Sequence, residues 1–279
     1  MNAAHPLHHP LPTRFTARFG LSTPIALAPM ALASGGALAA ACARAGALGL
    51  VGGGYGDLAW TQREYQLALQ AADTGRIGCG FITWKLDEDA SALDWVLDLP
   101  PAQRPRALML SFGDPRPYAA RLAAAGVPLI CQVQRLAQVP EAIEAGAAVI
   151  VAQGAEAGGH GMHALEGRST FTLVPELADW LAAHAPETLL LAAGGIADGR
   201  GMAAAFALGA EGVNMGTRFF ATQEAPVHPQ IKQALVNATE RDTKLIFRTL
   251  KNTTRVLKNA VSEEVVATEN RPGGCTFED

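Results

Sequence analysis

Residues 147–152, Ala-Ala-Val-Ile-Val-Ala, run directly into residues 153–161, Gln-Gly-Ala-Glu-Ala-Gly-Gly-His-Gly, and this stretch decides the fold. Six consecutive apolar residues predict a buried strand of the kind found in parallel sheets. The glycines that follow predict a loop whose backbone can approach a ligand closely. Because this loop presents one histidine, His160, we expect a site at the carboxyl end of the strand.

Seven more short apolar runs bounded by Gly or Pro occur along the chain, with Ala-rich stretches of helical composition between them. This alternation predicts parallel βα units. Eight units predict a (β/α)8 TIM barrel, which carries its active site at the carboxyl ends of the strands. A doubly wound sheet fits the same pattern. The predicted strands are residues 25–28, 48–51, 77–82, 107–111, 129–133, 148–152, 189–192 and 212–215.

Composition restricts the class of protein. The chain has 279 residues, of which 49% are hydrophobic and 17% charged, enough for a large core in an ordered globular protein. A net charge of −4 offers no basic surface for nucleic acid, so the expected partner is a small molecule. Neither a secretory signal nor a membrane span is expected, because the N-terminus lacks a cationic and then apolar region and Arg44 interrupts the apolar residues 31–54.

The cysteines point to a reducing compartment. They are far apart in the sequence and form no C-x-x-C pair, which predicts reduced thiols in a cytoplasmic protein. The four cysteines are Cys42, Cys79, Cys131 and Cys275.

The βα pattern stops near Thr222. We therefore expect residues 1–221 to form the barrel and residues 222–279 to form a helical appendage, with helices over 229–236 and 244–262. Cationic residues recur in the second helix at spacings of three and four, which predicts one charged helix face, most simply a solvated one. These residues are Lys244, Arg248, Lys251, Arg255 and Lys258.

Two glycine-containing turns predict a phosphate site. Gly194 and Gly195 follow the seventh predicted strand, and Gly216 and Thr217 follow the eighth. Barrels commonly bind phosphate on backbone N–H groups at this position, although plain tight turns would have the same composition. Asp198 is a candidate N-cap for the helix that follows Gly195.

His160 is the candidate base, because imidazole titrates near neutral pH and the flanking glycines provide little core around it. The alternative is a histidine that only hydrogen-bonds its own loop. Metal binding has little support, since Glu156, His163 and Glu166 are the only other potential ligands nearby. No G-x-S-x-G motif or recognisable Cys/His pair predicts a hydrolase.

Four motifs, taken in order, resemble those of the nitronate monooxygenase family, once called 2-nitropropane dioxygenases, which are FMN-dependent barrel enzymes. They are Ala28-Pro29-Met30, residues 153–161, Ala-Gly-Gly-Ile-Ala-Asp-Gly at 193–199, and Gly-Val-Asn-Met-Gly-Thr-Arg-Phe at 212–219. Residues 247–259 are similar to the family as well. The resemblance covers most of the chain and implies the same fold and cofactor.

The resemblance implies a role for each matching residue. Met30, with the backbone of Ala28 and Pro29, would lie against the flavin ring, and Gln132 and Gln153 would touch the ring or the ribityl chain. His160 would take a proton from the carbon next to a nitro group or orient a nitronate. The residues that would hold the FMN phosphate are Gly158, Gly159, Gly194, Gly195, Gly216 and Thr217.

The function implied is oxidation of alkyl nitronates or nitroalkanes, with flavin as electron acceptor and molecular oxygen completing turnover. One alternative is a related FMN enzyme that passes hydride from NAD(P)H to a quinone or an enoyl thioester. The glycine-rich residues 52–56 are only a weak dinucleotide-binding pattern. Another alternative is a non-catalytic barrel that binds flavin or phosphate.

The sequence departs from the family pattern in two ways. Some relatives have an asparagine after the third strand and a lysine at the end of the fifth, where this chain has Gly80 and Gln132. Relatives also usually continue beyond residue 279 with a segment that returns as the last barrel helix. Without it, we expect either a homo-oligomer or coverage of strands one, seven and eight by residues 244–262.

Overall fold

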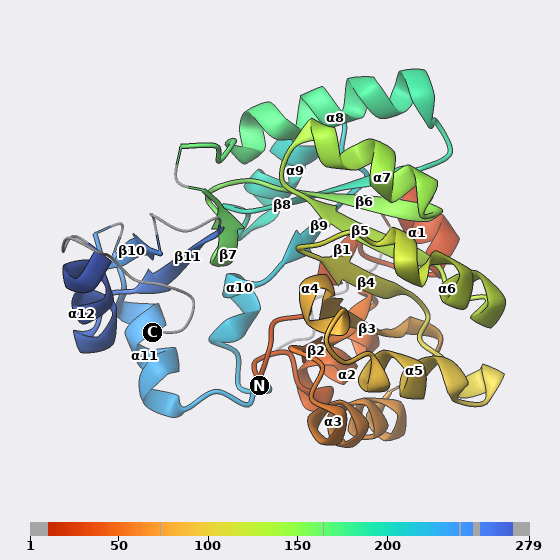
Figure 1. Cartoon of the computed structure of the whole chain (residues 1–279), viewed down its shortest axis with the longest axis horizontal. Coiled ribbons are helices and arrows are strands. Elements are labelled where there is room, and N and C mark those ends of the chain that lie inside the picture. Colours follow the sequence, from red (N-terminus) through yellow and green to blue (C-terminus); the bar gives the residue numbers. More distant parts are fainter. Residues whose placement is uncertain (1–10, 73, 164, 240, 248–251, 270–279) are drawn as a thin grey trace, which may run out of the picture.

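Eight short parallel strands form the centre of the chain, with helices around them (Figure 1). The structure is a computed structural model, and it describes residues 11–72, 74–163, 165–239, 241–247 and 252–269. The strands are β1 (Ile25–Leu27), β2 (Gly49–Gly54), β3 (Ile77–Ile82), β4 (Leu108–Ser111), β5 (Leu129–Val133), β6 (Ala147–Gln153), β8 (Leu189–Ala193) and β9 (Gly212–Met215). All eight predicted strands are confirmed, with ends shifted by no more than a few residues.

The sheet closes into a barrel. Its strand order is β1-β9-β8-β6-β5-β4-β3-β2, and a parallel bridge between Ala26 and Leu48 joins the two outer strands. The Leu27 N–H donates to the Leu48 carbonyl, and the Leu48 N–H donates to the Ile25 carbonyl, both at 2.9 Å. An open doubly wound sheet would leave these strands unpaired, so the (β/α)8 barrel is confirmed.

Helices follow the strands and bury their apolar faces against the outside of the barrel. They are α2 (Gly36–Arg44), α3 (Leu58–Ala71), α4 (Thr83–Leu86), α5 (Ser91–Asp98), α6 (Ala119–Ala125), α7 (Val139–Glu144), α8 (Thr170–His184), α9 (Gly199–Ala207) and α10 (Thr217–Phe220). Gly126 ends α6 in the left-handed conformation (φ 67°), as a glycine C-cap predicts. Asp198 caps α9 by accepting from the N–H groups of Arg200 and Gly201, as predicted.

A first helix, α1 (Arg14–Phe19), closes the amino-terminal end of the barrel. Phe15 and Phe19 are buried in the same apolar cluster as the side chains that fill the barrel interior. A Cβ built on Gly212, the first residue of β9, would lie 3.1 Å from the Phe15 ring. The opposite end, where the strands finish, is therefore the end left for a site.

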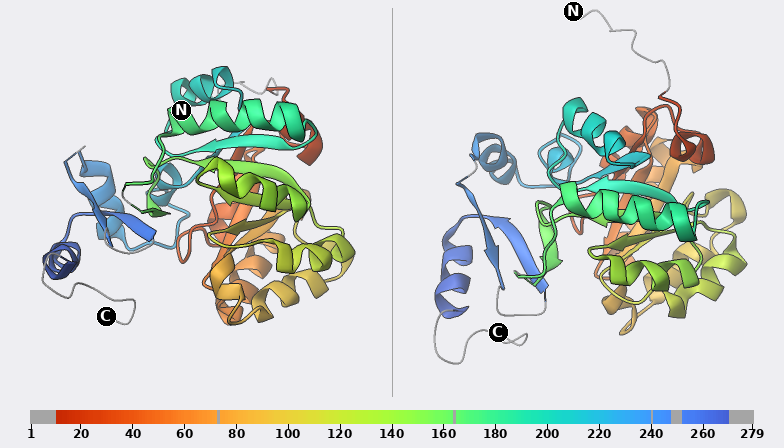
Figure 2. Two further views of the ribbon diagram at one scale, coloured as in Figure 1. Left: turned by 45° about the horizontal axis from the view of Figure 1, so that its top comes forward. Right: turned by 90° about the horizontal axis from the view of Figure 1, so that it is seen from above.

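The C-terminal part differs from its prediction. β10 (Thr243–Ile246) and β11 (Asn252–Leu257) pair antiparallel, and β11 also pairs with a strand that was predicted as a loop, β7 (Gly159–Met162). This three-stranded sheet lies to one side of the barrel with α11 (Pro229–Asn237) and α12 (Ala260–Glu269) (Figures 1 and 2). The predicted helix at 229–236 is confirmed, and the helix at 244–262 is wrong.

The reason lies in residue type and in pairing. Residues 253–257, Thr-Thr-Arg-Val-Leu, are mostly β-branched, which favours a strand once a partner edge is present. The predicted cationic helix face is absent as well: Lys244 pairs with Glu263 at 2.6 Å, while Arg255 donates to the Ala155 carbonyl at 3.2 Å. Arg248 and Lys251 lie outside the described residues. The appendage is a mixed α/β unit.

The segment after β9 covers the side of the barrel that lacks a long eighth helix. Leu27, Val213 and Met215 are buried there, and Phe219 and Val227 pack against the same outer apolar cluster. Coverage by residues 244–262 was therefore wrong, because β10 pairs with β11 and β11 pairs with β7 instead. Self-association stays a prediction.

Two further findings concern the cysteines and the apolar character of the helices. Cys42, Cys79 and Cys131 are buried free thiols, and Cys275 lies outside the described residues. Among the described helices, none has the length and apolar character needed to cross a bilayer.

Candidate active site

The loop after β1 lies between the ends of two other strands. A Cβ built on Gly216, just after β9, would lie 3.3 Å from Met30 Sδ and 3.4 Å from Ala28 Cβ. On the other side, a Cβ on Gly80 of β3 would overlap Pro29. The structure thus brings Ala28, Pro29 and Met30 to the barrel mouth, and Gly80 is required by the close approach of Pro29.

Three glycine-containing loops meet beside this point. A Cβ on Gly158 would lie 2.8 Å from Thr217 Oγ1, and a Cβ on Gly195 would lie 3.4 Å from Glu156 Cβ. Gly194 and Gly195 have φ values of 105° and 71°, which only glycine adopts readily. The residues predicted to hold a phosphate are therefore neighbours in space, although β6, β8 and β9 supply them separately.

Backbone donors at this meeting point are unused. Within the described residues, the N–H groups of Gly194, Gly195 and Gly216 donate to no protein acceptor. Gly194 and Gly216 are half-buried and Gly195 is exposed, so these donors are open to an incoming ligand. Neighbouring free backbone N–H groups of this kind can bind an anion. We call residues 158, 159, 194, 195, 216 and 217 the glycine cradle.

Glu156 fixes one loop of the cradle. Its carboxylate accepts from the backbone N–H of Thr170 at 2.9 Å and from the Thr170 hydroxyl at 3.0 Å. The same hydroxyl lies 2.9 Å from the Gly194 carbonyl. Thr170 begins α8, so Glu156 satisfies a free donor at that helix start and ties the loop to it. Sequence reasoning considered Glu156 only as a weak metal ligand and missed this role.

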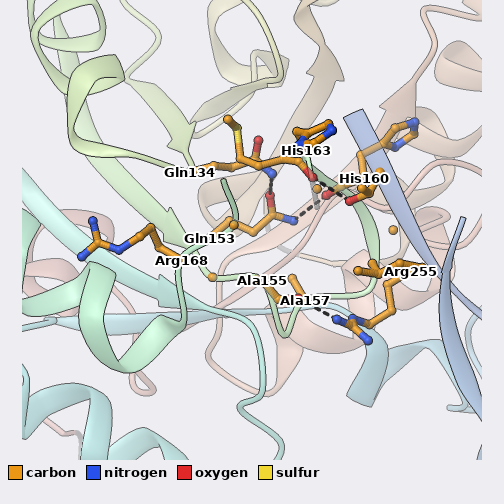
Figure 3. A pocket seen from close by; sticks show the side chains of 15 residues that line it. Gln134, Gln153, Ala155, Ala157, His160, His163, Arg168 and Arg255 are labelled. Atoms are coloured by element: carbon orange, nitrogen blue, oxygen red, sulfur yellow. Dashed lines mark hydrogen bonds between the residues drawn. The ribbon is translucent and has the colours of Figure 1, made fainter. Parts of the chain in front are cut away.

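Three glutamines form a largely buried network next to β7, and Figure 3 shows two of them, Gln134 and Gln153. Gln153 Oε1 accepts from Gln132 Nε2 at 2.9 Å and from Gln134 Nε2 at 2.7 Å. Gln153 Nε2 donates to the backbone carbonyl of His160 at 3.2 Å. The ends of β5 and β6 therefore support the strand that carries the candidate base.

His160 lies in β7, not in the loop that was predicted. Its backbone is paired with Thr254 of β11, and its imidazole is half-buried. Burial lowers the pKa of this imidazole from its usual 6.5, because the charged form loses hydration. Burial therefore favours the neutral form of His160, which is the form that can accept a proton. His163, by contrast, accepts from the N–H of Leu165 and holds its own loop.

Aromatic side chains surround the imidazole. The ring centroids of Phe112 and Tyr55 lie 5.4 Å and 6.1 Å from that of His160, and the Tyr55 hydroxyl is 3.4 Å from Nε2. Trp84 stands edge-on to Tyr55 at 6.0 Å. Sequence reasoning assigned no role to these three residues. Their place in the sequence could have marked them as candidate site residues, because each follows the carboxyl end of a predicted strand.

The site contains no metal-binding cluster among the residues that the structure describes, since no group of three or more His, Cys, Asp or Glu side chains comes together there. The arrangement places the half-buried imidazole of His160, the candidate base, on the strand that continues from the glycine cradle.

Comparison with known proteins identifies relatives. A family model described as nitronate monooxygenase matches residues 88–274. The chain is 34% identical over 242 residues to a nitronate monooxygenase of Neurospora crassa and 37% identical over 239 residues to nitronate monooxygenase npaC of Metarhizium robertsii. Each match covers 76% of this chain and 63% of the relative, so the chain spans less than two thirds of their length.

Solved structures agree with this relationship. FabK from Thermotoga maritima superposes with a TM-score of 0.81 and 32% identity, covering 93% of this chain and 79% of its own. A nitroalkane oxidase from Streptomyces ansochromogenes superposes with a TM-score of 0.75 and 27% identity, covering 90% of this chain and 80% of its own.

Proposed function

Because the chain belongs to the nitronate monooxygenase family, we propose that it is a flavin-dependent oxidoreductase that oxidises alkyl nitronates or nitroalkanes with molecular oxygen. The observation that carries the proposal is the half-buried His160 in β7, whose pKa is lowered by burial, next to loops that converge on the glycine cradle. Family membership supports the flavin, and these residues support the reaction.

The cradle fits the phosphate of FMN. Gly194, Gly195 and Gly216 offer free N–H donors, and a side chain at Gly158 or Gly216 would fill the space against Thr217 or Met30. Met30 and the backbone before it, which approach Gly216 at the barrel mouth, would lie against the flavin ring, and Gln132, which donates to Gln153, would touch the ring or the ribityl chain. When bound, the flavin would accept the electron pair of the substrate and return it to oxygen.

The work of the chain itself is proton transfer. A nitro group acidifies the neighbouring C–H, and a free nitrogen of the His160 imidazole would take that proton. The C–H bond breaks, its electron pair is delocalised into the nitro group, and an N–H bond forms on the imidazole. With a preformed nitronate the proton is already gone, so no proton transfer to His160 is needed.

One titration tests the cofactor and the chemistry together. Purified protein is reconstituted with excess FMN and its visible spectrum is recorded, first without oxygen after adding a nitroalkane or propionate 3-nitronate, and then with oxygen. Bleaching by the substrate and recovery with oxygen are expected. Bleaching by NADH instead would favour the reductase alternative, and uptake of FMN without any turnover would favour a non-catalytic binder. Failure to take up FMN would overturn the proposal.

A further inference from the structure

Tyr55 and His160 come from opposite parts of the sequence and meet through their polar atoms. Tyr55 follows β2, and His160 lies in β7. The Tyr55 Oη is 3.4 Å from His160 Nε2, a long hydrogen bond of the kind that free enzymes often show before substrate binds. Nδ1 of the same ring makes no hydrogen bond to any described residue. The two ring nitrogens are therefore not equivalent.

Two aromatic rings pack against the imidazole. Tyr55 stands at 66° to the imidazole plane, and Phe112 packs against the imidazole at 48°. Phe112 has a φ of 64°, in the left-handed region that a bulky side chain rarely occupies. Backbone strain of this kind persists where the surroundings impose it, and it is concentrated at functional sites.

Charged groups on the neighbouring elements have other partners. Lys85, beyond Trp84, pairs with Glu88 at 2.7 Å, and Arg255, next to Thr254 on β11, donates to the Ala155 carbonyl. Asp114, on the loop after Phe112, pairs with Arg116. His163, the residue directly after β7, accepts from the Leu165 N–H. Tyr55 is thus the polar group that contacts the imidazole directly among the described residues.

We propose that Tyr55 is a positioning residue that sets the tautomer of His160: its hydroxyl oxygen accepts the Nε2–H, and Nδ1 is left as the nitrogen that takes the substrate proton. Which nitrogen of a histidine carries the proton is decided by the hydrogen bond that the other one makes or lacks. This inference rests on the function proposed above, since it assigns the atom at which that proton is received.

The same contact strengthens as the proton moves. The C–H bond of the nitroalkane breaks, the new N–H forms at Nδ1, and the imidazolium then has a proton on both nitrogens. Its Nε2–H continues to donate to Tyr55, now as a charge-assisted hydrogen bond, which is stronger than the neutral one. Burial raises the pKa of the Tyr55 hydroxyl, so it stays protonated and neutral throughout. Tyr55 therefore favours the charged form of the base.

The test is Tyr55→Phe, which keeps the ring contacts and removes only the hydroxyl. Histidine is labelled with ¹⁵N, and the His160 signal is assigned from its absence in His160→Asn. In the unsubstituted chain we expect the Nε2–H tautomer. In Tyr55→Phe we expect a mixture of tautomers and a lower His160 pKa, and kcat with neutral nitroalkanes should fall about tenfold, the value of one net hydrogen bond. FMN affinity and turnover of preformed nitronates should change less than about twofold, since neither depends on this proton transfer.

Tyr118→Phe is the matched control, because it removes a tyrosine hydroxyl that donates to Asp87 at 2.6 Å and does not contact His160. It should leave the His160 tautomer and pKa unchanged. An Nδ1–H tautomer in the unsubstituted chain, or the same tautomer and pKa in Tyr55→Phe, would overturn the proposal. The NMR result needs no turnover, so a chain that lacks nitroalkane activity but shows the expected tautomer shift refutes the proposed function alone.

Discussion

The side chain of Gln153, the last residue of β6, donates to the backbone carbonyl of His160 at 3.2 Å. Two more glutamines donate to the Oε1 of Gln153, so a single amide links β5, β6 and β7. The strand that carries the candidate base is therefore held by a polar network inside the barrel mouth, in addition to its pairing with β11.

Gln153→Leu should show the value of this network. Leucine has nearly the same volume but leaves the amides of Gln132 and Gln134 without their acceptor. An unsatisfied buried polar group costs about 1–3 kcal/mol, so the loss of the acceptor of Gln134, which is buried, and of Gln132, which is half-buried, should lower the free energy of unfolding by at least that amount. Chemical denaturation measures it. Gln134→Leu removes only one of the two donors and should lower the free energy of unfolding by less. An equal or larger decrease would contradict the role of Gln153 as the centre of the glutamine network.

His160→Asn should keep the fold and the bound FMN but lose activity with neutral nitroalkanes. A positioned base contributes about 10²–10⁴-fold, and asparagine cannot accept the proton. Activity with preformed nitronates should fall less, because no C–H bond is broken. Steady-state kinetics on both substrates gives the comparison. Equal losses would mean that His160 binds or orients the anion and does not act as a base.

The pH profile should follow the lowered pKa of His160. Only the neutral imidazole accepts a proton, so nitroalkane oxidation should decline on the acid side with a midpoint below the usual 6.5. Stability should follow the same group: as pH falls below about 6.5, the unfolded chain takes up this proton before the folded chain does, and the free energy of unfolding decreases. The His160→Asn variant should lack the part of this pH-dependent decrease in stability that comes from the imidazole. An acid midpoint above 6.5 would contradict the effect of burial.

Gly195→Val tests the glycine cradle. The residue has a φ of 71° and would place a Cβ 3.4 Å from Glu156, so valine should force the backbone out of position and weaken FMN binding. Fluorescence titration of FMN measures the affinity. Gly199→Val is the matched control, because a Cβ built there would meet no atom within 4 Å apart from its chain neighbours and its own helix backbone. Unchanged affinity in Gly195→Val would show that the phosphate is bound elsewhere.

The barrel could be predicted from sequence because its signals are local. Each strand is a short apolar run between Gly or Pro residues, and the predicted bounds for β3, β5 and β9 agree with the structure. The predicted cofactor residues come together because the carboxyl ends of parallel strands all lie at one end of the barrel. Their individual roles stay predictions.

The predictions that were wrong concern segments whose structure depends on contacts with distant parts of the chain. Gly159–Met162 has weak strand propensity and becomes a strand only because β11 pairs with it. The Lys244 region shows helical charge spacing, but its residues find a β partner instead. The sequence shows that Tyr55 follows the carboxyl end of a predicted strand. Its contact with His160, however, depends on how the loop after β2 lies relative to the β7–β11 sheet, which the sequence does not show.

The pairing of His160 with Thr254 also sets an order of events while the protein is made. All eight barrel strands precede β11 in the chain, so we expect a nascent chain to close its barrel while β7, the strand that carries the candidate base, still has no partner. A chain that ends between Met215 and Asn252 would therefore have every barrel strand but no support for β7. We expect the position of His160 to be fixed only after β11 has been synthesised.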